Sequence, residues 1–218
     1  MIEISPAILT NDVSDFRKKY AELFALSHEF TKLHVDFADG LFVNTVTVMP
    51  AEVDFIKSSP FTLMAHVMAL HPEKYFKEIK KIGFKYVIFH FESITDRFQV
   101  ADVIAFAKYL ELKVGLAVNP ETPLYRIAKH LSNVDLVQIM GIQPGRQGRE
   151  FMPSTLDKVK ELRSLSKSAI IIVDGGVKVG IAHKLAEAGA DILVAGSAIV
   201  QAKDPKKAIE DLKADIQI

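Results

Sequence analysis

The sequence contains no cysteine among its 218 residues. Disulfide bonds and thiolate chemistry are therefore excluded, which fits a protein of the reducing cytoplasm. An excess of one charge is also lacking, because 27 Lys and Arg residues balance 27 Asp and Glu residues. Without a net positive field, the chain has no general attraction for nucleic acid or for an anionic membrane. A small molecule is the expected partner.

Long hydrophobic runs are absent as well. No apolar stretch approaches the roughly 20 residues needed to cross a bilayer, and Met1-Ile2-Glu3-Ile4 lacks the basic and apolar regions of a signal peptide. We therefore expect a cytoplasmic protein without a membrane segment. Hydrophobic residues make up 49% of the chain and charged residues 25%, which is typical of a domain with a sizeable core.

Apolar strands alternate with helical patterns along the whole chain. Strands rich in Ile, Val and Leu are expected at 2–9, 32–37, 61–67, 86–89, 113–118, 134–140, 169–173 and 191–195. Helices are expected at 16–24, 50–56, 73–82, 95–110, 123–131, 153–165, 177–188 and 205–216. Repetition of strand and helix at a period of about 25 residues is typical of a parallel sheet closed into a barrel.

Glycine is missing where the main alternative fold would need it. An open, doubly wound sheet would be expected to carry a Gly-rich turn after its first strand, whereas the turn here is Leu9-Thr10-Asn11-Asp12. The sequence also has no linker or low-complexity segment. The prediction is a (β/α)8 TIM barrel, a single domain of residues 1–218.

Four polar residues stand at the ends of three apolar strands. His34 and Asp36 are two residues apart and point to the same face of their strand, while His66 and Asp174 close two other strands. Because barrel strands end at a common mouth, we expect the four side chains to converge there. Two imidazoles and two carboxylates form a ligand set suited to zinc, iron, cobalt or manganese. A structural cluster of His and Asp is the alternative.

Taken in order, the motifs of this chain resemble the ribulose-phosphate 3-epimerase family. The second strand of that family reads His-x-Asp-x-Met-Asp-Gly-x-Phe-Val, and its third strand ends in His-x-Met. The matching segments here are 5–9, 34–43, 66–68, 90–92, 119–123, 140–151, 173–177 and 195–199. The resemblance covers nearly the whole chain and implies an isomerase of carbohydrate metabolism that serves the pentose phosphate pathway.

The resemblance also implies a mechanism. A metal-dependent 3-epimerase would interconvert D-ribulose 5-phosphate and D-xylulose 5-phosphate through a metal-stabilised enediolate. Asp36 would accept a proton on one face of the sugar and Asp174 would return one on the other, while both bind one divalent metal ion beside His34 and His66. Zinc is the first candidate for this ion, with iron, cobalt and manganese as alternatives.

Glycines near the last three strands suggest where the phosphate binds. Barrels commonly bind phosphate through backbone N–H groups after strands seven and eight, although such glycines can also serve only to make tight turns. The loop after strand six resembles the mobile lid of the family. The residues expected at the phosphate are Gly145, Arg146, Gln147, Gly148, Gly175, Gly176, Gly196 and Ser197. The expected pocket lining is Ala7, Leu9, Met68 and Met140.

Several residues depart from the family pattern and leave alternatives open. Ala7 replaces a serine that contacts substrate in the family, Ala38 replaces a methionine, and Leu41 replaces a histidine. Because these changes alter the pocket wall, 3-epimerisation of a hexulose 6-phosphate of the allulose type is an alternative. A barrel that binds sugar phosphate without catalysis is another. His90 and Glu92 are expected either to support the metal ligands or to be structural, and a homo-oligomer is left open.

Overall fold

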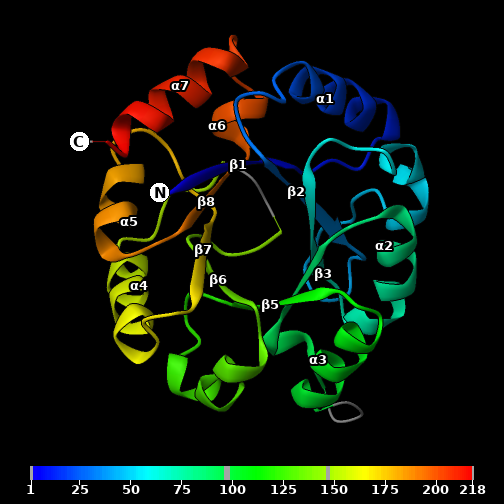
Figure 1. The fold of residues 1–218 in the computed structure, drawn as a ribbon, viewed down its shortest axis with the longest axis vertical. Coiled ribbons are helices and arrows are strands. Elements are labelled where there is room, and N and C mark those ends of the chain that lie inside the picture. Colours follow the sequence, from blue (N-terminus) through cyan, green and yellow to red (C-terminus); the bar gives the residue numbers. More distant parts are fainter. Residues whose placement is uncertain (1, 96–98, 146–147, 218) are drawn as a thin grey trace.

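A computed structural model describes residues 2–95, 99–145 and 148–217 of the protein. Within these residues, parallel strands close into a barrel in which each strand pairs with the next and β1 pairs with β8 (Figure 1). The strands are β1 (Glu3–Ile8), β2 (Lys32–Ala38), β3 (Thr62–Met68), β4 (Tyr86–His90), β5 (Lys113–Val118), β6 (Leu136–Met140), β7 (Ile170–Asp174) and β8 (Ile192–Ala195). The predicted TIM barrel is therefore confirmed.

Helices form a ring around the barrel (Figure 1). The α-helices are α1 (Val13–Ala25), α2 (Phe76–Ile82), α3 (Val100–Tyr109), α4 (Ser154–Leu165), α5 (Ala182–Ala188), α6 (Ser197–Val200) and α7 (Pro205–Asp215). Short 3-10 segments cover Pro50–Ile56, Pro72–Tyr75, Phe91–Ser93, Leu124–Arg126 and Ala128–Asn133. No helix in the described ranges is long and apolar enough to span a membrane.

The helix predicted at 123–131 is wrong in type. This connection between β5 and β6 forms two 3-10 turns, in which Ile127 N–H donates to the Leu124 carbonyl and His130 N–H donates to the Ile127 carbonyl. Leu124, Ile127 and His130 are buried. Burial at every third residue matches the three residues per turn of a 3-10 helix.

The helix predicted at 177–188 begins later than expected. Helix α5 starts only at Ala182, because Gly176 and Gly180 have φ angles of +72° and +84°, outside the right-handed helical region. Its end is as predicted, with Gly189 in the left-handed conformation just after the last helical residue. The extra residues before α5 lengthen the loop that follows β7.

Two apolar layers hold the barrel together. The outward faces of the strands pack against the helices, as Leu33, Val35 and Phe37 do on β2. A smaller cluster fills the barrel interior, and we refer to it as the interior plug. Its members are Ala7, Met64, Ile88, Ala117, Leu136, Ile172, Ile192 and Val194. Because side chains alternate along β2, His34 and Asp36 point inward, above this plug.

Candidate active site

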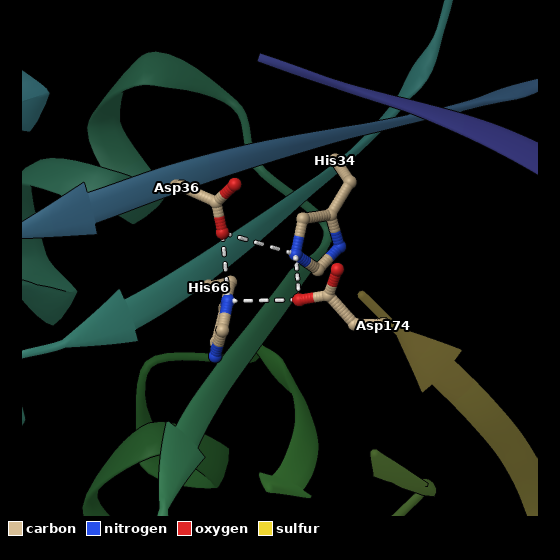
Figure 2. Close-up of side chains that lie close together, drawn as sticks. All are labelled: His34, Asp36, His66 and Asp174. Atoms are coloured by element: carbon tan, nitrogen blue, oxygen red, sulfur yellow. Dashed lines mark hydrogen bonds and ion pairs between the residues drawn. The ribbon is translucent and has the colours of Figure 1, made fainter. Parts of the chain in front are cut away.

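Four polar side chains from three strands meet at the mouth of the barrel (Figure 2). His34 and Asp36 come from β2, His66 from β3 and Asp174 from β7. One ligand atom from each lies within 4.8 Å of the others. Parallel register explains part of this arrangement, since Asp36 pairs with His66 across the β2–β3 ladder. The convergence predicted from the sequence is therefore present.

Each carboxylate in this cluster contacts both imidazole rings through one of its oxygens. Asp36 Oδ1 lies 2.7 Å from His66 Nδ1 and 3.5 Å from His34 Nε2. Asp174 Oδ2 lies 3.4 Å from His66 Nδ1 and 3.7 Å from His34 Nε2. Figure 2 shows the two carboxylates on opposite sides of the two rings. Both imidazoles are fully buried, and Asp36 is only 5% exposed.

Burial and charge shift the pKa values of the two histidines in opposite directions. Burial lowers the pKa of His66 to about 4, even though Asp36 favours its charged form. The ring of His66 is thus neutral near pH 7, the form that binds metal. Burial also opposes charge on His34, but the contacts with Asp36 and Asp174 outweigh it and raise the pKa of His34.

The pKa values of the two carboxyl groups also shift in opposite directions. Burial by itself favours the neutral form of Asp36, but contacts from His34 and His66 outweigh it and hold the pKa of Asp36 below its usual range. Burial, together with repulsion from Asp36, raises the pKa of Asp174 to about 7 despite the attraction of His34. A matched pair of carboxyl groups with opposite shifts is typical of acid and base partners in enzymes.

The cluster fits a divalent cation. In the described part of the chain, neither ring nitrogen of His34 has a hydrogen-bond partner, although both are buried. Unpartnered buried nitrogen is costly, and so are two neighbouring buried carboxylates. A cation held by His34, Asp36, His66 and Asp174 would offset both costs, and two nitrogen with two oxygen donors suit zinc and its neighbours in the first transition series.

A second row of polar residues lies behind His66. His66 Nε2 is 2.9 Å from His90 Nε2, and His90 Nδ1 is 3.5 Å from Glu92 Oε2. Glu92 Oε1 accepts hydrogen bonds from the Asn119 N–H and the Thr122 hydroxyl. If Nδ1 of His66 offers its lone pair to a metal, Nε2 carries the proton and donates to His90. His90 and Glu92 therefore lie where the sequence led us to expect supporting residues.

A cavity of about 470 Å³ opens above the cluster. Asp36, His66 and Asp174 line its floor, while His34 lies just below it. The four residues expected in the lining are present, namely Ala7, Leu9, Met68 and Met140. The residues expected at the phosphate that also border the cavity are Gly145, Gly148, Gly175, Gly176, Gly196 and Ser197. Arg146 and Gln147 lie outside the described residues.

The glycines after β7 are required by close packing. Gly175 and Gly176 have φ angles of +100° and +72°. A Cβ atom on Gly175 would lie 2.3 Å from a side-chain carbon of Ile142, and one on Gly176 would lie 2.8 Å from the Cα of Phe151. Tight turns thus account for both glycines, and the same turns bring bare backbone to the edge of the cavity.

A comparison with protein families shows to which family the chain belongs. The model of the family described as "Ribulose-phosphate 3 epimerase family" matches residues 3–200. The chain belongs to this family. It is 32% identical to a ribulose-phosphate 3-epimerase of Bacillus subtilis (strain 168), covering 98% of this chain and 99% of that protein. It is 35% identical to the chloroplastic ribulose-5-phosphate-3-epimerase of Arabidopsis thaliana, covering 98% of this chain and 76% of that protein.

Solved structures agree on the fold. The 3-hexulose-6-phosphate synthase of Salmonella typhimurium superposes with a TM-score of 0.74 and 16% identity, covering 99% of both chains. This identity is too low to carry function, and it supports the barrel alone. The family membership, in contrast, makes the protein an epimerase of the isomerase class. The family and the enzyme class predicted from the sequence are both confirmed.

Lys178 and Gln138 border or support the site, although no role was predicted for either from the sequence. Arg149 and Lys178 line the cavity. A basic residue close to a glycine turn is the sequence feature that could have identified Lys178. Gln138 lies on β6, is fully buried, and donates to Asp174. Its signal is a lone amide inside the apolar strand Leu136–Met140, on the same face as Met140.

Proposed function

We propose that this epimerase interconverts D-ribulose 5-phosphate and D-xylulose 5-phosphate by moving protons at C3. The observation that carries the proposal is a pair of carboxyl groups, Asp36 and Asp174, on opposite sides of one site and backed by His34 and His66. Inversion of a carbon centre needs a proton acceptor on one face and a donor on the other. The names of the relatives at 32% and 35% identity support the choice of substrate.

The proposed cofactor is one divalent cation held by His34, Asp36, His66 and Asp174. When bound, it stabilises the negative charge that develops on the oxygens beside C3 once the proton is removed. Zinc remains the first candidate, followed by iron, cobalt and manganese, because each accepts mixed nitrogen and oxygen ligands.

The side chains divide the proton transfer between them. In one direction, a carboxylate oxygen of Asp36 takes the proton from C3, and the carboxyl group of Asp174 gives its proton to the opposite face. In the other direction the two roles exchange. The lowered pKa of Asp36 suits the acceptor, and the raised pKa of Asp174 favours the donor role. Because a bound cation would keep both carboxyl groups largely ionised, Asp174 would take up the proton that it donates only when substrate binds.

The phosphate is proposed to bind at the β7–β8 side of the cavity. Backbone turns at Gly175, Gly176 and Gly196 border that side, and Ser197 adds a hydroxyl. Backbone N–H groups in such turns recognise phosphate oxygens without a matched side chain. The positive charges of Arg149 and Lys178, which also line the cavity, would strengthen the attraction of a dianion.

A hexulose 6-phosphate is the alternative substrate. Ala7 lines the cavity and is a small side chain without a polar atom, so the wall beside it leaves more room than a serine would. One additional carbon in a pocket changes discrimination by only about 10- to 200-fold. The ratio of kcat/KM for the pentulose and hexulose phosphates therefore decides between the two substrates.

Solvent exchange at C3 tests the proposal. Metal-loaded protein is incubated in heavy water with ribulose 5-phosphate, and the deuterium at C3 and the yield of xylulose 5-phosphate are followed by NMR. We expect deuterium in the product at the rate of epimerisation. Tight binding of the sugar phosphate with no exchange would indicate a barrel that binds without catalysis. Exchange only with a hexulose phosphate would replace the proposed substrate with the alternative.

A further inference from the structure

Gln138 occupies an unusual place in the barrel. It lies on β6 between Leu136 and Met140, and all three side chains point to the barrel interior. Leu136 belongs to the interior plug, while Met140 lines the cavity. Gln138 is fully buried at the boundary between them. A buried amide therefore lies directly next to an interior plug whose members are all apolar.

Burial of this amide is costly unless its hydrogen bonds are satisfied. Gln138 Nε2 donates to Asp174 Oδ2 at 3.0 Å and approaches the Met140 sulfur at 3.5 Å. Its Oε1 is buried and has no partner in the described ranges. Folding stability alone does not explain the amide, because a Met or Leu of similar size would fill the same space without an unpartnered oxygen.

Gln138 contacts the same Asp174 oxygen that faces His34 and His66. Asp174 Oδ2 is 3.0 Å from Gln138 Nε2, 3.4 Å from His66 Nδ1 and 3.7 Å from His34 Nε2. The other oxygen of Asp174 takes part in none of the contacts drawn in Figure 2. The amide thus fixes which carboxylate oxygen faces the ligands and which stays free.

We infer that Gln138 is a positioning residue for Asp174. Its amide holds Oδ2 at the cation site and so directs the free oxygen of the same carboxyl group toward the sugar. Asp36 has different neighbours, since its cluster oxygen lies 2.7 Å from Nδ1 of His66 and 3.5 Å from Nε2 of His34. Loss of Gln138 should therefore weaken the Asp174 half of the site and leave the Asp36 half in place. This inference rests on the role proposed for Asp174.

The test compares two variants that remove the donor with one control. Gln138→Met and Gln138→Leu keep an apolar side chain of similar size. Leu136→Met changes the same face of the same strand but lies in the plug, away from Asp174. For each protein, metal affinity is measured by competition with a chelator, and kcat and KM are measured on the metal-loaded enzyme with ribulose 5-phosphate.

Partners that orient metal ligands change metal affinity or activity by about 10- to 100-fold. We expect both Gln138 variants to bind metal at least about 10-fold more weakly and to lose kcat by a similar factor. KM should stay within about twofold, because the phosphate side is not touched. The Leu136→Met control should match the unsubstituted protein in metal affinity and kcat.

Two results would overturn the inference. One is metal affinity and kcat within about twofold of the control in both Gln138 variants. The other is a loss of kcat that simply follows the thermal unfolding midpoints of the three variants, since that pattern indicates packing alone. If the unsubstituted protein does not epimerise ribulose 5-phosphate, the proposed substrate is wrong, and the metal competition still tests Gln138.

Discussion

The two sides of the cavity are built in different ways. On the β2–β3 side, three buried side chains form most of the proposed metal site, and the pairing of Asp36 with His66 across the ladder fixes them. On the β7–β8 side, turns at Gly175 and Gly176 bring backbone to the cavity, and the packing of Ile142 and Phe151 fixes them. Side-chain identity dominates the first region, whereas backbone shape dominates the second apart from the carboxyl group of Asp174. Substitutions should therefore separate the two regions in metal affinity, kcat and KM.

Removal of a proposed acid or base should give the largest effect. We expect Asp36→Asn and Asp174→Asn each to lower kcat by at least about 100-fold, because an amide neither accepts nor donates the transferred proton. Steady-state assays in both directions with metal-loaded proteins measure the effect. Asp157→Asn, an exposed change on α4, serves as the control. Near-native rates in either active-site variant would contradict the two-base assignment.

Loss of the support behind His66 should come next. His90→Phe leaves the Nε2–H of His66 without its acceptor, so we expect metal affinity to fall by about 10- to 100-fold. His90→Gln keeps an acceptor near that position and should recover part of the loss. Chelator competition measures both. Equal affinity in His90→Phe and the unsubstituted protein would mean that His90 only fills space.

A change in the β7 turn should affect the sugar phosphate and spare the metal. Gly176→Ala forces a Cβ atom to 2.8 Å from the Cα of Phe151, so we expect the turn to shift and KM to rise by about 10-fold. Gly180→Ala is the matched control, because Gly180 also has a positive φ but has open space around its Cβ. It should cost about 1 kcal/mol in the free energy of unfolding. A parallel rise in KM for both would assign the effect to strain alone.

The smallest expected effect is the release of a proton from Asp174 when the metal binds. Its pKa near 7 lies above the ordinary value of 3.8, so the group holds a proton below pH 7, and a cation must displace it. We expect release from this group to approach one proton at about pH 6 and to vanish at about pH 8. Calorimetry in buffers of different ionisation enthalpy measures it. Asp174→Asn should remove this part, and a release unchanged by that substitution would refute it.

Sequence patterns predicted the elements that depend on short-range order. The strand expected at 113–118 coincides with β5, and the alternation around His34 and Asp36 gave the correct inward face. The ends of strands meet at one mouth in any barrel, so the convergence of His66 and Asp174 followed from the fold class. Patterns within one segment were sufficient for these features.

Features that depend on contacts between distant segments were not predicted. The bond from Gln138 to Asp174 exists because β6 and β7 pair with Met140 opposite Asp174, and no local pattern specifies that register. The turn type at 123–131 depends on how the connection between β5 and β6 packs, which overrode a helical pattern. The close approach of Phe151 to Gly176 is likewise a property of two loops together.

The interior plug limits how substrate and product reach the site. Met64, Ile88, Leu136 and their neighbours fill the barrel below the cluster, so the described cavity opens at the mouth of the barrel and does not continue through its lower end. Both epimers carry the same phosphate and would enter the cavity through the same opening. Because only one of them can occupy the cavity at a time, each epimer would inhibit the conversion of the other competitively.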